Sequence, residues 1–133
     1  MSTARLSSTV AIALLAATLP GYAHHSFSAQ FDSKKPLKMT GTVTKVEWQN
    51  PHSWFYLDVK DETGAVTNWG FELASPNLLL RKGWTRTTLE AGAVVTVEGF
   101  RAHDDSNTGN ARVIVLASTG KTLLGGSSQG STP

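Results

Sequence analysis

The chain has 133 residues, no cysteine and a formal net charge of +2 at neutral pH. Its length suits one domain with a single hydrophobic core, which no disulfide stabilises. Of its twelve basic residues only Arg5 precedes residue 24, and the rest are scattered among ten acidic residues. This balance excludes the strongly basic surface that binds nucleic acid or an anionic membrane.

The first 23 residues have the pattern of a secretory signal peptide. Arg5 precedes an apolar run from Val10 to Leu19, and Gly21-Tyr22-Ala23 is a small-x-small cleavage site. The apolar run is shorter than the ~20 residues that a transmembrane helix needs. We therefore expect a periplasmic or secreted protein, with no stable membrane insertion once residues 1–23 are removed.

Cleavage after Ala23 leaves a histidine at the new amino terminus. His24 then offers an amine and an imidazole nitrogen within one chelate ring, and His25 stands beside it. Nitrogen ligands of this kind suit Cu(II), and a distant histidine can complete the site. We predict copper binding by His24, His25 and His52, with His103 as the reserve ligand. The alternative is that the two histidines only keep the terminus polar, while His52 forms a hydrogen bond in its turn.

The polar segment over residues 24–36 forms an arm, either a short helix or an extended stretch. From 38 to 48 the sequence alternates with a period of two, which predicts a first strand. The alternation places Lys45 and Glu47 on the same face as Val43. The first strand therefore carries charged and apolar side chains on one face.

A turn at Asn50-Pro51-His52 leads into an aromatic and β-branched segment, 54–60, which predicts a second strand. A loop containing Gly64 then joins it to a third strand over 66–73. Because glycine adopts positive φ without strain, this loop predicts an antiparallel hairpin.

A short helix follows the hairpin. Ser75 is a suitable N-cap, Pro76 fits the first helical position, and Gly83 ends the helix. The remaining expected segments are a strand at 94–101, a polar loop at 102–110, a strand at 111–117, an extended stretch at 121–124 and a disordered Gly/Ser tail at 125–133.

The predicted order is three strands, one helix and two strands. This is the order of the oligonucleotide/oligosaccharide-binding (OB) barrel. We therefore predict an all-β, mainly antiparallel domain over residues 37–124. It is a small five-stranded OB-like barrel with one short helix between strands three and four. The alternative is that the strands form a flattened β-sandwich.

Aromatic side chains are numerous for a domain of this size. Barrels of this type present such rings on one face, where sugars or bases stack. We expect Trp54, Tyr56 and Trp69, with Asn50 in the adjoining loop, to bind a small non-metal ligand or a protein partner. The alternative is that the rings fill the interior of the barrel.

Six runs of residues together resemble a family of short exported bacterial proteins known only as a domain of unknown function. The resemblance covers almost the whole chain after residue 23 and implies export and one small β domain, but no activity. The sequence contains no Gly-x-Ser-x-Gly or His-Glu-x-x-His motif, so we expect an envelope binding module or structural protein rather than an enzyme. The runs are HHSF (24–27), GTVTKVEW (41–48), NPHSW (50–54), SPN (75–77), RKGW (81–84) and VEGFRA (97–102).

Overall fold

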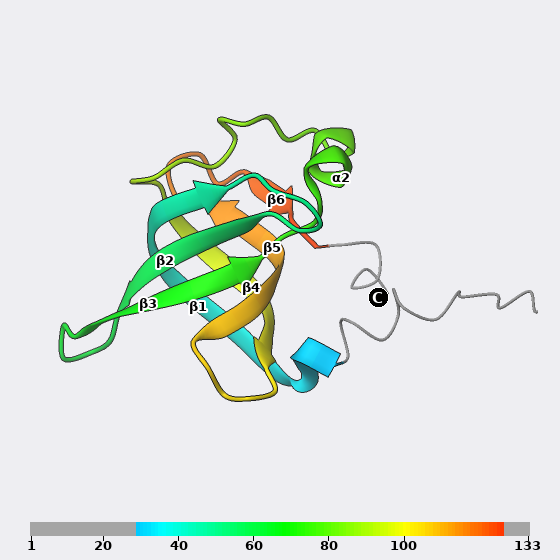
Figure 1. Ribbon diagram of the computed structural model, residues 1–133. Helices are drawn as coiled ribbons and strands as arrows, with labels where there is room; N and C mark the ends of the chain where they lie inside the picture. The colour runs from blue at the N-terminus through cyan, green and yellow to red at the C-terminus, as the bar shows by residue number, and fades with distance from the viewer. Residues whose placement is uncertain (1–28, 127–133) are drawn as a thin grey trace, which may run out of the picture.

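The computed structural model describes residues 29–126, drawn in colour in Figure 1. The predicted signal peptide, His24 and His25 lie outside these residues. The described chain forms six strands and a short helix: β1 (Phe31–Glu47), β2 (Trp54–Lys60), β3 (Val66–Glu72), α2 (Pro76–Arg81), β4 (Val94–Ala102), β5 (Thr108–Leu116) and β6 (Thr122–Leu124). Across 29–126 no helix is long and apolar enough to span a bilayer.

The five longer strands pair in a closed ring. β1 lies antiparallel between β2 and β4, β2 pairs with β3, and β4 pairs with β5. A short parallel pairing between β3 and β5 closes the ring, and β6 adds to β5. The mainly antiparallel all-β fold is confirmed, with α2 between the third and fourth strands as predicted. One ring of five strands is what an OB-like barrel requires, rather than two separate sheets.

The core fills the inside of the ring. Phe55 and Phe71 stack there with ring centroids 5.3 Å apart, and neither side chain is exposed. α2 adds the buried Leu79, and its N-cap Ser75 accepts a hydrogen bond from the Leu78 amide as the sequence predicts. Trp84 donates its indole hydrogen to the Leu124 carbonyl at 3.1 Å, which ties the segment after α2 to β6.

The first strand begins earlier than the alternation predicts. Phe31 pairs with Ala102 and Pro36 with Phe100, with an irregular register between them. Part of the predicted arm therefore belongs to the sheet. The reason is tertiary, because β4 supplies the partner backbone and Phe31 is buried at 1% exposure.

The fifth strand also begins earlier, at Thr108, so the loop before it shrinks to residues 103–107. Thr108 to Asn110 pair in parallel with β3. A Cβ on Gly109 would lie 2.9 Å from the Phe71 ring, so glycine allows the backbone of β5 to lie close to this ring. At the other end, Gly125 donates to the Arg112 carbonyl and accepts from the Ala74 amide, which places it in the fold rather than in the predicted tail.

Candidate functional site

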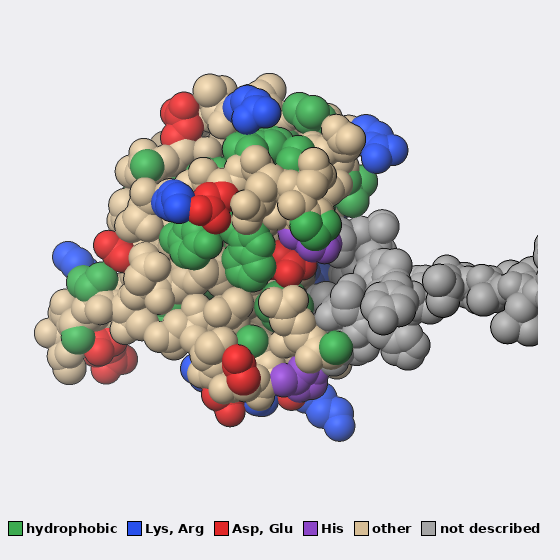
Figure 2. Space-filling view, in the orientation of Figure 1, with side chains coloured by type: hydrophobic (Ala, Val, Ile, Leu, Met, Phe, Trp, Pro, Cys, Tyr) green, Lys and Arg blue, Asp and Glu red, His purple; other side chains and the backbone are tan. Residues whose placement is uncertain are grey.

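Two aromatic rings lie close together on the outward face of β2 and β3. Across the two strands Trp54 pairs with Glu72 and Tyr56 with Gly70. A Cβ on Gly70 would lie 3.2 Å from Cε1 of Tyr56 and 3.9 Å from Cε3 of Trp54, so glycine gives both rings room against the sheet. Figure 2 shows hydrophobic side chains in the middle of this face, between a basic and acidic pair and a histidine.

A β-bulge in β1 brings two charged residues to this face. The register against β2 shifts between Val43 and Lys45, while Val43 and Val46 both pack into the core. Lys45 therefore lies opposite Tyr56, and Glu47 lies opposite Trp54. The expectation that Lys45 and Glu47 share the face of Val43 was wrong, because the extra residue of a bulge reverses the alternation.

Lys45 and Glu47 surround the Tyr56 ring. The Tyr56 hydroxyl donates to Glu47 Oε2 at 3.1 Å, and Lys45 Nζ lies 5.8 Å from the ring centroid and forms an ion pair with Glu47. The hydrogen bond from Lys45 lowers the pKa of the Glu47 carboxyl, whereas burial raises the pKa of the Tyr56 phenol. This end of the face therefore offers an ionised carboxylate, an ammonium group and a neutral hydroxyl.

A histidine and a buried acid occupy the other end. His52 Nδ1 lies 3.2 Å from the Leu73 carbonyl oxygen and 3.5 Å from Glu72 Oε1. Because a carbonyl only accepts, Nδ1 carries the hydrogen and Nε2 is the nitrogen left to contact a ligand or metal. Glu72 is 8% exposed, and burial raises its pKa, although the nearby charge of His52 lowers it.

Trp69 does not join Trp54 and Tyr56. It pairs with Leu57, whose side chain is fully buried, and stacks on Phe71 with ring centroids 6.2 Å apart. The Arg101 guanidinium lies 5.2 Å from its ring. Trp69 is thus on the inner side of β3, in accord with the alternative that some rings cover the core.

Asn50 is exposed in the loop before β2, and its part in a ligand site stays a prediction. From the sequence, Glu47 and Glu72 could face a pocket but were interpreted as the solvent-exposed side of a sheet, and Lys45 was not considered as a site residue. The sequence contains a sign of where Lys45 and Glu47 lie, because Val43 and Val46 are three residues apart and cannot both face the core in a strand with an unbroken period of two. Glu72 had one as well, because it interrupts a run of otherwise apolar residues.

The two described histidines lie in different loops and show as separate patches in Figure 2. His103 Nδ1 lies 3.7 Å from Asp32 Oδ2, and its backbone amide donates to the Gln30 carbonyl at 3.0 Å. His103 therefore lies beside the start of the described chain. Within 29–126 no three histidine or acidic side chains are grouped so that they could hold a metal ion.

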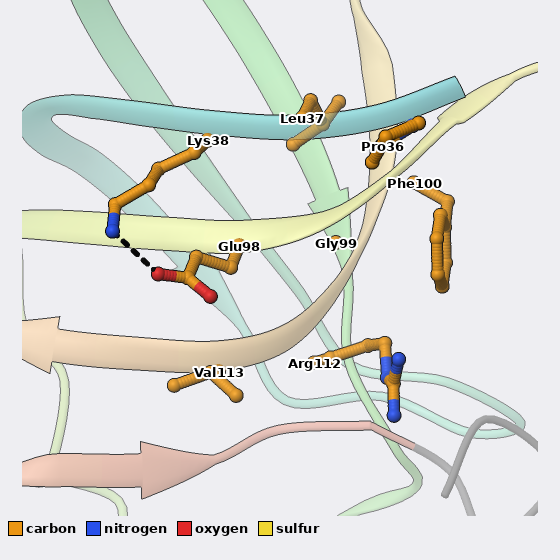
Figure 3. A pocket seen from close by; sticks show the side chains of 8 residues that line it. All are labelled: Pro36, Leu37, Lys38, Glu98, Gly99, Phe100, Arg112 and Val113. Carbon is orange, nitrogen blue, oxygen red and sulfur yellow. Dashed lines mark ion pairs between the residues drawn. The ribbon is translucent and has the colours of Figure 1, made fainter. Parts of the chain in front are cut away.

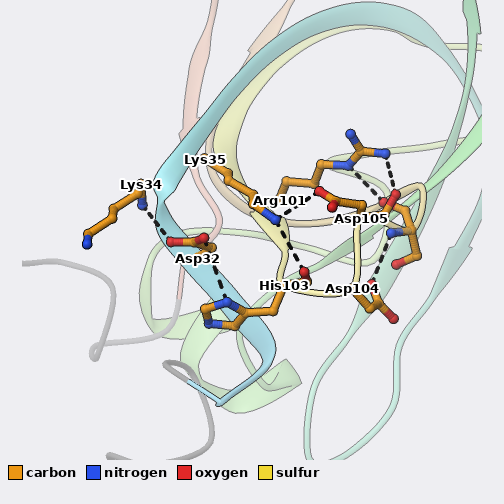
Figure 4. Close-up of polar contacts among 8 residues, drawn as sticks. Asp32, Lys34, Lys35, Arg101, His103, Asp104 and Asp105 are labelled. Carbon is orange, nitrogen blue, oxygen red and sulfur yellow. Dashed lines mark hydrogen bonds and ion pairs between the residues drawn. The ribbon is translucent and has the colours of Figure 1, made fainter.

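The loop that contains His103 is held by a network of polar contacts (Figure 4). Lys35 Nζ donates to Asp105 Oδ1 at 2.8 Å and to the His103 carbonyl at 3.2 Å. Asp104 accepts from the Ser106 amide, and Arg101 Nε donates to the Ser106 carbonyl. The hydrogen bond from Lys35 lowers the pKa of Asp105. These acidic groups stabilise the loop through contacts within this part of the fold.

The family of unknown function DUF6152 matches residues 11–111. The chain belongs to this family. The DUF6152 match covers β1 to β4 and the start of β5, and so includes both aromatic residues of the outward face and Glu72. The resemblance to an uncharacterised family is thereby confirmed. No curated protein matches the chain.

Proposed function

We propose that this protein is an exported binding module that holds a sugar ring on the outward face of β2 and β3. The observation that carries the proposal is the placement of the Trp54 and Tyr56 rings side by side over Gly70. The apolar face of a sugar packs well on an aromatic ring, and the face of strands two and three is where OB-type barrels bind oligosaccharides.

The polar groups around the rings favour a neutral ligand rich in hydroxyl groups. Lys45 is paired with Glu47, and His52 lies beside Glu72, so each end of the face holds one basic and one acidic side chain. A charged ligand would find little net charge here, whereas hydroxyl groups find both donors and acceptors. The near balance of basic and acidic residues also argues against nucleic acid.

Export is part of the proposal and depends on the signal-peptide pattern of residues 1–23. A periplasmic or secreted module meets sugars of the envelope and of the surroundings.

The test uses protein exported and processed by a bacterial host, titrated with maltotetraose, cellotetraose and chitotetraose by calorimetry and tryptophan fluorescence. At least one of these should bind with a dissociation constant below a millimolar. Removing a stacking ring costs about 1–3 kcal/mol, so Trp54→Ala should weaken binding about 5- to 150-fold.

Trp69→Phe is the matched control, because Trp69 lies on the inner side of the neighbouring strand and should leave affinity unchanged. If none of the three sugars binds, or if Trp54→Ala binds as tightly as the unaltered protein, the sugar site does not exist.

A second candidate, supported by a different observation, is copper binding at His24. Gln30 accepts a hydrogen bond from His103 and follows His24 by six residues, a length that spans at most ~20 Å. His103 is therefore within reach of the predicted amino terminus, and the Nε2 atom of His52 is suited to a metal. The site would comprise His24, His25 and one of these two histidines.

A further inference from the structure

A hollow lies where the hairpin of β2 and β3 leaves β1. The pairing of β1 with β2 reaches only Thr42 and Asp58, whereas β2 and β3 stay paired as far as Lys60 and Val66. Figure 1 shows this hairpin projecting from the rest of the strands. The volume of the hollow is about 480 Å³, within the range of roughly 300–1,000 Å³ that small-molecule sites occupy. We call it the hairpin hollow, and the side chains that line it are Thr40, Thr42, Asp58, Lys60, Val66 and Val94.

The hairpin hollow continues the face that carries Trp54 and Tyr56. Alternate residues of a strand share a face, so Asp58 and Lys60 follow the two rings along β2. Lys60 follows Trp54 by six residues, a span of ~20 Å at about 3.4 Å per residue. This row of side chains is longer than one sugar ring. A ring stacked on Trp54 and Tyr56 therefore leaves the hollow to later units of the same chain.

The side chains of the hairpin hollow suit a neutral sugar. Asp58 Oδ1 accepts a hydrogen bond from Asn68 Nδ2 at 2.8 Å, which orients the carboxylate and leaves it lone pairs for a hydroxyl group. Lys60 adds a hydrogen-bond donor of opposite charge. Val66 and Val94 stay exposed, so they offer a surface to the apolar face of a sugar. One acidic and one basic side chain give the hollow no net charge that would favour an ionic ligand.

We propose that the hairpin hollow is a second subsite, and that the ligand is a linear, neutral oligosaccharide that runs along β2 from the two rings to Lys60. This inference rests on the sugar face proposed above and adds the length of its ligand. Trp54 and Tyr56 hold one unit by stacking, and the hollow holds a later unit through its hydroxyl groups. Because both units belong to one chain, binding of the second unit is intramolecular and raises the affinity.

The test compares chain lengths on protein exported and processed by a bacterial host. Calorimetry measures maltotetraose, cellotetraose and chitotetraose against maltose, cellobiose and chitobiose. The tetrasaccharide that binds best should bind about tenfold or more tighter than its disaccharide. The double variant Asp58→Ala, Lys60→Ala should lose most of this difference and weaken the disaccharide little, because two units at the rings stop short of Lys60. Trp54→Ala should weaken both sugars.

The matched control is the double variant Lys38→Ala, Glu98→Ala. It removes another acidic and basic pair, 2.8 Å apart in a separate groove over β1, β4 and β5 (Figure 3), and should leave both affinities unchanged. NMR of the unaltered, isotope-labelled protein gives a readout that needs no variant. The tetrasaccharide should shift the amides of Thr42 and Lys60, and the disaccharide should not.

Two kinds of failure are distinguishable. If a disaccharide binds as tightly as its tetrasaccharide, if the variant at Asp58 and Lys60 keeps the full difference, or if the amides of Thr42 and Lys60 do not shift, the second subsite does not exist although the sugar face stands. If none of the six sugars binds, the sugar face and the second subsite are both overturned.

Discussion

Glu72 is an acid placed within a run of buried residues, from Phe71 to Ala74. Burial raises its pKa above the ordinary value of 4.5, and His52 only partly offsets this effect. Between 4.5 and the raised pKa the folded protein binds more protons at this position than the unfolded chain does. Glu72 therefore contributes stability that is fully present below pH 4.5 and is lost as the pH rises through its raised pKa.

Glu72→Gln removes this titration and keeps the size and shape of the side chain. We expect the stability of the unaltered protein, relative to the variant, to fall as the pH rises above 4.5. Urea unfolding at several pH values measures the difference. Glu62→Gln, in the exposed loop after β2, should show no such trend. Parallel stability curves for Glu72→Gln and the unaltered protein would contradict this expectation.

At the scale of elements, two β-bulges determine the face on which charged side chains lie. The bulge in β1 turns Lys45 toward Tyr56, and a second bulge, in β5, makes Arg112 the extra residue and places it beside the Phe100 ring. Both reverse the alternation of a strand after a single residue. Simple period-two reading of β1 therefore places Lys45 on the wrong face.

Gly99→Ala tests the second bulge. The added Cβ would lie 1.6 Å from the Asn110 carbonyl oxygen, so β4 and β5 must move apart. We expect the free energy of unfolding to fall by about 3 kcal/mol. Gly126→Ala is the control, because its Cβ would meet neighbours at 3.7 Å or more and should cost little. Urea unfolding of both variants measures the effect, and equal stabilities would show that the strands adjust freely.

At the scale of the whole molecule, the ring closes through the short pairing of Thr108 to Asn110 with β3. The chain has no cysteine, so packing inside this ring stabilises the fold. Its described start lies beside His103. The copper prediction therefore depends on whether the mature chain begins at His24, as the signal-peptide pattern predicts.

Intact mass of the exported protein should correspond to a chain that begins at His24. Cu(II) should bind with a submicromolar dissociation constant in calorimetry, because the terminal amine, with a pKa near ~8, releases its proton on binding. His24→Ala should abolish this binding. His52→Ala and His103→Ala, compared side by side, identify the distant ligand. A different amino terminus, or undiminished binding by His24→Ala, would rule out the site.

The sequence by itself determined the second, third and fourth strands, the hairpin at Gly64 and the helix that begins after Ser75. These features depend on alternation, turn residues and capping, which act between near neighbours in the chain. It also determined that Trp54 and Tyr56 share a face, since they are two residues apart in one strand.

Only the tertiary structure decided the closure of β3 on β5, the early starts of β1 and β5, and the two bulges. It also placed Trp69 and Trp54 on opposite faces of the sheet and brought Glu72 next to His52. The physical reason is common to all of these. Pairing register and burial depend on contacts between strands that are distant in sequence, and a local signal such as the phase change between Val43 and Val46 marks a bulge without specifying its partners.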